Sequence, residues 1–216
     1  MRRALVIAAL AGVLAASPAG AQYYGETHWT GHIAGGATVP LNDLTNVVNT
    51  GWNFTLGATY WPSMEGFLGI MLEGQYNGFS MTNDFTNILH VPDAYGAFWP
   101  VTLNLVLSPG RSSKAGLYLV GGGGAYILHA AATAPTTTGG IVCEPWWPYY
   151  CYPTTIPADY VLGSKTVTKG GVDGGVGINL PVGPESAFYI EGRYHYVFTD
   201  KGNTIEFIPI VAGLRW

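Results

Sequence analysis

Charged side chains share one face of several alternating stretches of this sequence. Within residues 187–198, Glu191, Arg193 and His195 occupy alternate positions, which share one face of a strand. Ile190 and Tyr194 lie on the other, apolar face. If the charged face is buried, its members must pair, because an isolated buried charge is very costly. We therefore predict an ion-paired interior, with a proton or ion path as the functional alternative and His32 as a candidate further member. The predicted network consists of Glu73, Lys169, Asp173, Glu191, Arg193, His195 and Arg215.

The segment 130–166 holds a second set of chemically distinctive residues. Cys143 and Cys151 enclose the sequence EPWWPYY. A disulfide between them would close a short loop and stabilise the chain by about 2–3 kcal/mol in the chain-entropy model. Tyrosine and tryptophan are favoured contact residues, so we expect either an external recognition surface or a self-packed lid. The candidate recognition residues are Trp146, Trp147, Tyr149 and Tyr150.

The first residues have the layout of a secretory signal peptide. Arg2 and Arg3 precede an aliphatic run from Ala4 to Ala16, and the small-residue sequence 19–21 follows. The run is shorter than the roughly 20 residues that a spanning helix needs. We expect residues 1–21 to be removed and 22–216 to form one domain. Export favours the disulfide, and we expect no metal and no cofactor because the chain lacks the Cys/His spacing of a zinc site.

Composition argues against both an ordinary soluble domain and a helical membrane protein. Only 10% of residues are charged, against about 25% in typical soluble domains. Aromatic residues reach 13%, yet after the N-terminal run no apolar stretch approaches the length of a spanning helix. A membrane β-barrel resolves this conflict, because its strands need only about 9–11 residues with alternate side chains facing lipid.

Two-residue alternation predicts the strands that position these side chains. The connections tend to alternate between short ones, at 63–66, 108–114 and 181–186, and long ones, at 40–50, 82–96 and 130–166. Outer-membrane barrels have short periplasmic turns and longer external loops, so we expect the long connections outside. A ten-stranded barrel is the alternative if 130–166 contains an added hairpin. The eight expected strands are Thr27–Val39, Gly51–Trp61, Phe67–Met81, Ala97–Leu107, Ala115–His129, Val167–Leu180, Ala187–Phe198 and Glu206–Trp216.

Large aromatic residues near the ends of these stretches fit the girdles that form at lipid interfaces. The six expected girdle residues are Trp29, Trp52, Tyr60, Trp61, Trp99 and Trp216.

The last stretch, IPIVAGLRW, alternates apolar residues and finishes on Trp216. It resembles the assembly signal of bacterial outer-membrane proteins, with Ile208, Ile210, Leu214 and Trp216 in the signal positions. The chain as a whole resembles the small eight-stranded outer-membrane barrels of the OmpX and OmpA-transmembrane-domain kind. The resemblance implies an all-β, antiparallel, up-and-down transmembrane barrel with its loops at the cell surface. It also implies outer-membrane lipid and the barrel-assembly machinery as partners.

The function expected from these features is a non-catalytic outer-membrane barrel with a structural or surface-interaction role. An external protein or glycan is a candidate partner, and no nucleic acid is expected. A narrow, porin-like channel for small solutes or ions is one alternative. An outer-membrane enzyme is the other, and its candidate residues would be His90, Asp93, His129 and Asp200. The glycine-rich sequence 120–126 lacks the Lys-Ser/Thr of a phosphate loop, so we attribute its small residues to a tight barrel wall.

Overall fold

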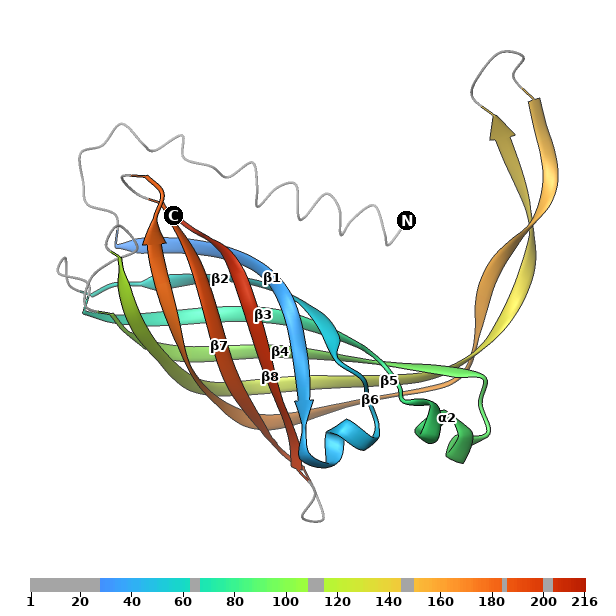
Figure 1. Ribbon diagram of the computed structural model, residues 1–216, viewed down its shortest axis with the longest axis horizontal. Coiled ribbons are helices and arrows are strands. Elements are labelled where there is room, and N and C mark those ends of the chain that lie inside the picture. The colour runs from blue at the N-terminus through green and yellow to red at the C-terminus, as the bar shows by residue number, and fades with distance from the viewer. Residues whose placement is uncertain (1–27, 63–66, 109–114, 145–149, 184–185, 200–203) are drawn as a thin grey trace.

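The strands of the computed structural model close into a single barrel (Figure 1). The structure describes residues 28–62, 67–108, 115–144, 150–183, 186–199 and 204–216. Each strand pairs antiparallel with the next, and β8 returns to pair with β1. The predicted eight-stranded up-and-down barrel is therefore confirmed, and the ten-stranded alternative is wrong. The strands are β1 (Trp29–Leu41), β2 (Gly51–Tyr60), β3 (Leu68–Ser80), β4 (Asp93–Leu107), β5 (Gly116–Glu144), β6 (Tyr150–Pro181), β7 (Ala187–Phe198) and β8 (Thr204–Arg215).

Two short helices occupy connections in which no helix was predicted. The 3-10 helix η1 (Asn42–Asn46) follows β1, and α2 (Asn83–Leu89) precedes β4. Thr82 caps α2 by accepting a hydrogen bond from the Phe85 backbone N–H at 3.3 Å. In the described part of the chain, neither helix is long and apolar enough to cross a membrane.

Side chains alternate between the two faces of the barrel wall along most of each strand. On β3, Leu72 is 59% exposed and points outward, while the next residue, Glu73, is 4% exposed and points inward. The same period-two pattern runs along β7. Apolar residues thus form the outer surface, and the buried charged side chains point into the interior, which is the arrangement of a transmembrane barrel and the reverse of a soluble one.

The interior is built in three layers along the barrel. One apolar cluster, which includes Trp61, Met71 and Tyr189, lies toward the end where β1 begins and β8 finishes. A second, which includes Phe98 and Phe207, lies toward the opposite end. Most of the charged residues lie between these clusters, and Arg215 lies beside Tyr118 and Tyr189 of the first cluster. We call the charged residues the charge layer, and define it as His32, Glu73, Asp173, Glu191, Arg193, His195 and Arg215.

Trp61 does not belong to the outer aromatic girdle, so that prediction is wrong for this residue. Its side chain is 1% exposed, and its Nε1–H donates to Thr30 Oγ1 at 3.1 Å inside the barrel. Adjacent residues of a strand face opposite sides, and Tyr60 is the one that faces outward. Trp29, Trp52, Trp99 and Trp216 are each about half exposed on the outer surface or more.

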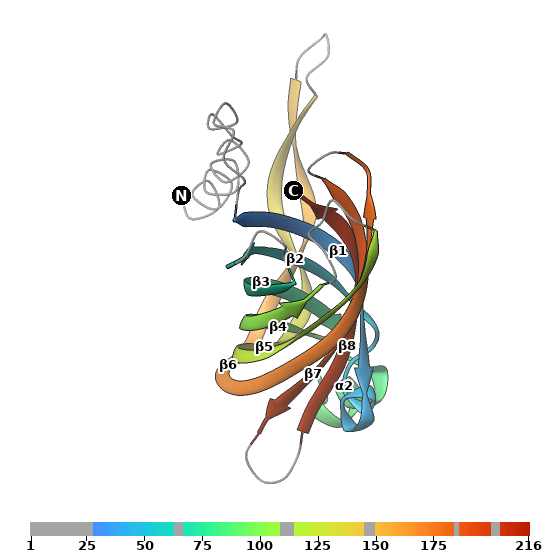
Figure 2. The same ribbon diagram turned by 90° about the vertical axis from the view of Figure 1, so that its left-hand side faces the viewer.

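The prediction of a long loop at 130–166 is also wrong, because most of this segment continues β5 and β6. In the described pairings, β4 pairs with β5 as far as Thr133, and β7 pairs with β6 only from Gly171. Beyond these points, residues 134–144 and 150–160 pair with each other as a two-stranded ribbon (Figures 1 and 2). At about 3.3 Å per residue, this hairpin ribbon is on the order of 35 Å long. The prolines of this segment are compatible with the ribbon, because a ribbon consists only of edge strands, where proline is tolerated. We call this end of the barrel the hairpin end.

Candidate functional site

Arg193 is the centre of the charge layer. Its guanidinium reaches three carboxylates on three strands: Nη1 donates to Glu73 Oε1 at 2.9 Å and to Asp173 Oδ2 at 3.2 Å. Nη2 donates to Glu73 Oε2 at 3.2 Å, and Nε donates to Glu191 Oε1 at 3.0 Å. The planar guanidinium fork suits this contact with several carboxylates, which an ammonium group could not reproduce. The arrangement therefore ties β3, β6 and β7 together across the lumen.

Arg215 forms the second positive centre, and it is held by aromatic rings. Its guanidinium lies 4.7 Å from the centroid of Tyr118 and 4.6 Å from that of Tyr189. Nη1 donates to Asn179 Oδ1 at 3.1 Å. The Tyr118 hydroxyl donates to Glu191 Oε2 at 2.7 Å, which links this arginine to the Arg193 cluster. Arg215 and the Arg193 cluster thus belong to one network of charge-assisted hydrogen bonds and cation–π contacts.

Both buried histidines join this layer. His32 Nε2 lies 3.0 Å from Glu73 Oε2. His195 Nδ1 lies 2.9 Å from the Tyr126 hydroxyl, and its ring stacks on Phe207 with a centroid distance of 4.8 Å. Each ring has one polar partner, which is a carboxylate for His32 and a hydroxyl for His195.

Glycines on neighbouring strands make room for the rings of the charge layer. Gly177 lies directly opposite Tyr118 in the ladder, and a Cβ at Gly177 would come within 2.3 Å of the tyrosine ring. Gly57 lies opposite His32, and a Cβ there would come within 2.5 Å of the imidazole. The glycines therefore form recesses in the barrel wall, and no phosphate-binding chemistry is needed to explain them.

The tyrosines of this layer were not among the predicted site residues. Tyr118 and Tyr126 lie on the same face of β5 as the glycines at 122 and 124. Leu117 and Ile127 lie on the other face. Tyrosine sharing a strand face with glycine, opposite a leucine-rich face, is the signal that could have identified them.

Lys169 lies nearer the mouth than the rest of the predicted network. It is half-buried and lines a cavity of about 1180 Å³ at the hairpin end. We call this cavity the vestibule. Its walls come from η1, α2, β4, the base of the hairpin ribbon and the β7–β8 region, and Lys165 also lines it.

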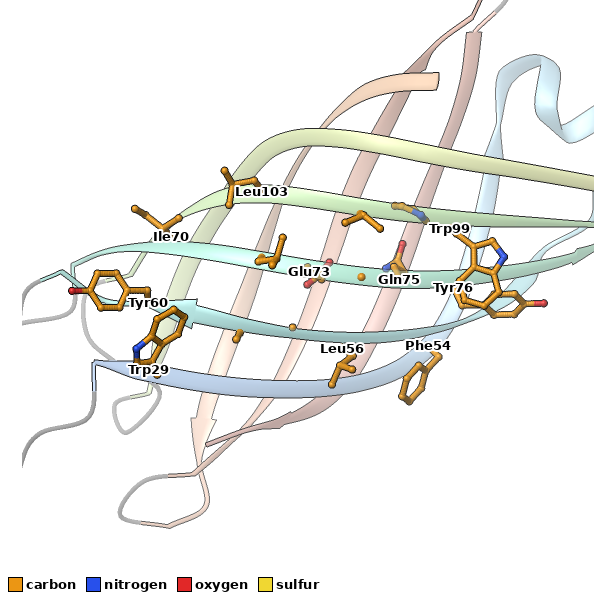
Figure 3. A pocket seen from close by; sticks show the side chains of 16 residues that line it. Trp29, Phe54, Leu56, Tyr60, Ile70, Glu73, Gln75, Tyr76, Trp99 and Leu103 are labelled. Carbon is orange, nitrogen blue, oxygen red and sulfur yellow. The ribbon is translucent and has the colours of Figure 1, made fainter. Parts of the chain in front are cut away.

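A second hollow, of about 900 Å³, lies on the outside of β2, β3 and β4. Small residues, including Ala58 and Gly74, replace large ones along it. Figure 3 shows Trp29 and Tyr60 at one end and Phe54, Tyr76 and Trp99 at the other. Because this surface is the apolar outer face of the barrel, we assign the hollow to contact with acyl chains.

The candidate enzymatic residues do not converge where the structure describes them. His90 Nδ1 contacts the Ile88 carbonyl oxygen at 3.1 Å, and Asp93 accepts from its neighbouring backbone N–H. His129 Nδ1 lies 2.9 Å from Thr166 Oγ1. Asp200 lies outside the described residues. Each described side chain thus has a separate local partner.

Trp146, Trp147 and Tyr149 lie outside the described residues, and only the backbone of Tyr150 is described. The signal segment 1–21 likewise lies outside them. Of the expected assembly-signal residues, Ile210, Leu214 and Trp216 are each about half exposed on the outer face of the barrel, and Ile208 is partly exposed.

The closed eight-stranded barrel, apolar outside and polar within, decides the structural class. Its architecture is that of the small outer-membrane β-barrels. No family model matches the sequence, and no curated protein matches it.

Several solved structures are similar to it at low sequence identity. Ail of Yersinia pestis, crystallised with the heparin analogue sucrose octasulfate, is 14% identical, with 88% of this chain and 100% of that chain covered and a TM-score of 0.49. Neisserial surface protein A is 14% identical, with 88% and 97% covered and a TM-score of 0.48. A major outer membrane protein from Thermus thermophilus is 11% identical, with 86% and 98% covered and a TM-score of 0.48.

Proposed function

We propose that this protein is a non-catalytic outer-membrane barrel that acts in surface interaction through its hairpin ribbon. The observation that carries the proposal is the ribbon itself, which extends beyond both neighbouring strands (Figure 1). A ribbon of this length adds nothing to the closure of the barrel. Its reach suits contact with a protein or glycan beyond the membrane surface.

The filled interior argues against the alternative of a narrow channel. Glu73, Asp173, Glu191 and Arg193 span the lumen, and none is more than 7% exposed. A water-filled pore would leave its lining accessible, whereas these side chains contact one another. We expect no steady conductance from the purified protein in planar bilayers at modest voltage. A stable open-channel current would support the channel instead.

A disulfide at the tip would stiffen the ribbon. Cys143 pairs with Cys151 in the backbone register, and directly opposed residues of antiparallel strands have Cβ atoms about 4.5–5.5 Å apart. That separation is close to the disulfide range of about 3.5–4.5 Å. The test is thiol labelling of the native protein without reductant. We expect no label, and two reactive thiols would contradict the disulfide.

The orientation follows from the usual asymmetry of outer-membrane barrels, whose longer connections face outward. The hairpin end holds η1, α2 and the ribbon, so we propose that this end faces the cell exterior. An epitope inserted between β5 and β6 should bind antibody on intact cells. The same epitope inserted between β4 and β5 should react only after the outer membrane is permeabilised. The opposite pattern would reverse the orientation.

The interaction role is tested by removing the ribbon alone. A variant in which residues 134–160 are replaced by a short turn keeps every described pairing of β4 with β5 and of β6 with β7. Cells carrying the wild-type protein and cells carrying this variant are compared on arrays of glycans and extracellular-matrix proteins. We expect binding that the variant loses. Equal binding by both, at equal surface levels, would overturn the role of the ribbon.

We propose that assembly of the barrel into the membrane depends on the outward face of β8. Trp216 is about half exposed, and its backbone N–H and carbonyl oxygen pair with Gly31 at 3.0 and 2.8 Å. Trp216→Ala leaves this backbone pairing available. We expect lower assembly in cells with unchanged refolding of the purified chain. Normal assembly in cells would limit Trp216 to an interfacial role.

A further inference from the structure

The vestibule combines apolar walls with basic side chains. Its lining includes four residues of the second apolar cluster: Leu44, Val48, Phe98 and Leu128. These side chains separate the cavity from the charge layer beneath it. A ligand that enters at the hairpin end therefore meets hydrocarbon at the base of the cavity.

The positive charge of the vestibule comes from one strand. Lys165 and Lys169 lie at alternate positions of β6, on either side of Val167, and all three line the cavity. They are the two lysines in the part of the chain that the structure describes, and both line this one cavity. Asp43, on η1, is a carboxylate of the lining, and His129 lines it as well. The β6 wall is thus basic, although the whole chain has a formal charge of −4.

Size and chemistry together identify the class of ligand. Small-molecule sites are commonly about 300–1,000 Å³, mostly apolar, with a few polar groups that fix orientation. The vestibule, at about 1180 Å³, is slightly larger than this range. A long alkyl chain would fill its apolar part, and a terminal anion would meet the lysines.

We propose that the vestibule binds a free long-chain fatty acid. The carboxylate lies at Lys165 and Lys169, and the acyl chain packs against Val48, Phe98 and Leu128. Lysine suits this role because its apolar stem can lie along the wall while its ammonium group reaches the anion. The site does not depend on the surface role of the ribbon, which lies further from the barrel.

The test uses the full chain in nanodiscs of zwitterionic phospholipid and a palmitate that carries a diazirine on its chain. Photolabelled residues are identified by mass spectrometry. Labelling of the outward residues Leu103 and Leu105, which are 59% and 54% exposed, reports probe dissolved in the bilayer and serves as an internal reference. We expect additional labelling of vestibule residues that unlabelled palmitate suppresses and hexadecanol, which has the same chain without the charge, does not.

Two variants separate the charge from the apolar walls. In Lys165→Gln/Lys169→Gln, loss of the charge-assisted contacts should weaken palmitate binding by about tenfold. In Val167→Trp, the indole should occupy the space between the two lysines and reduce labelling of the vestibule. Lys114→Gln, in the sequence between β4 and β5, removes a lysine elsewhere and should bind like the wild type.

Three outcomes would overturn the proposal. One is labelling confined to the outward residues. Another is unchanged vestibule labelling in the double lysine variant, with the reference labelling also unchanged. The third is competition by anionic phospholipid in the nanodisc that equals competition by palmitate, which would assign the site to a membrane lipid.

Discussion

The charge layer and the vestibule use the same strand face in opposite ways. Strand β6 contributes Asp173 to the charge layer, and Lys165 and Lys169 to the vestibule. In the charge layer, Asp173 is 7% exposed and paired with Arg193. In the vestibule, Lys165 is exposed and Lys169 is half-buried. An inward-facing charge on β6 is therefore buried in an ion-pair network deep in the barrel, and more exposed where the barrel opens.

The difference between the two regions is tested most directly by removing one cation from each of them. Arg193→Ala leaves the carboxylates of Glu73, Asp173 and Glu191 buried without their shared partner. We expect it to lower the free energy of unfolding by about 3–5 kcal/mol. The matched variant Lys165→Ala should cost less than about 1 kcal/mol, because exposed charges contribute little.

Urea unfolding of the refolded barrel, followed by tryptophan fluorescence, measures both variants. Equal losses of stability would show that depth does not separate the two regions. If Arg193→Ala fails to fold, Arg193→Lys keeps the charge without the bidentate geometry and should still be less stable than Lys165→Ala.

A second test compares the hydrogen bond of a tyrosine inside the barrel with that of a tyrosine on its outer surface. The hydroxyls of Tyr118 and Tyr194 each donate to a glutamate Oε2 at 2.7 Å, but only Tyr118 is buried. A buried hydrogen bond to a charged group contributes about 1.5–3 kcal/mol, so Tyr118→Phe should lower stability by that amount. Tyr194→Phe should change it by well under about 1 kcal/mol, because water replaces an exposed partner. The same unfolding assay decides, and a larger effect at Tyr194 would contradict the burial argument.

Two glycines extend the test to packing. A methyl group at Gly177 would lie 2.3 Å from the Tyr118 ring, whereas one at Gly163, in the vestibule lining, would meet nothing within 4 Å. Gly177→Ala should therefore cost about 1–3 kcal/mol through overpacking. Gly163→Ala should be close to neutral. Thermal unfolding of the two variants measures the difference, and equal midpoints would mean that the barrel wall adjusts around Tyr118.

The smallest effect is expected from the hairpin ribbon. Replacing residues 134–160 by a short turn removes a ribbon that extends beyond the reach of both β4 and β7. The free energy of unfolding of the remaining barrel should stay within about 0.5 kcal/mol of the wild type, as for changes away from packed features. A clear loss of stability in urea would show that the ribbon supports the vestibule and the barrel beneath it.

Local sequence pattern was enough to predict the barrel and the direction of most side chains. A period of two places Glu191 and Arg193 on one face wherever β7 lies, because successive residues of a strand point to opposite sides. The same rule could have separated Trp61 from Tyr60, which were both predicted to be girdle residues. The eight strands, their antiparallel order and the apolar outer face needed no more than this pattern and the low charge content.

Only the tertiary structure decided which charges meet in the charge layer and which line the vestibule. The contact between Arg193 and Glu73 joins positions 120 residues apart, and it depends on closure of the barrel and on the register of every ladder between them. The separation of Lys169 from the charge layer also depends on depth along the barrel, which parity does not contain. The ribbon could not be predicted either, because its pairing depends on a register shift between Ala132 and Thr133 and on where β4 and β7 stop. Parity is a property of one strand, whereas contact, depth and exposure are properties of the closed barrel.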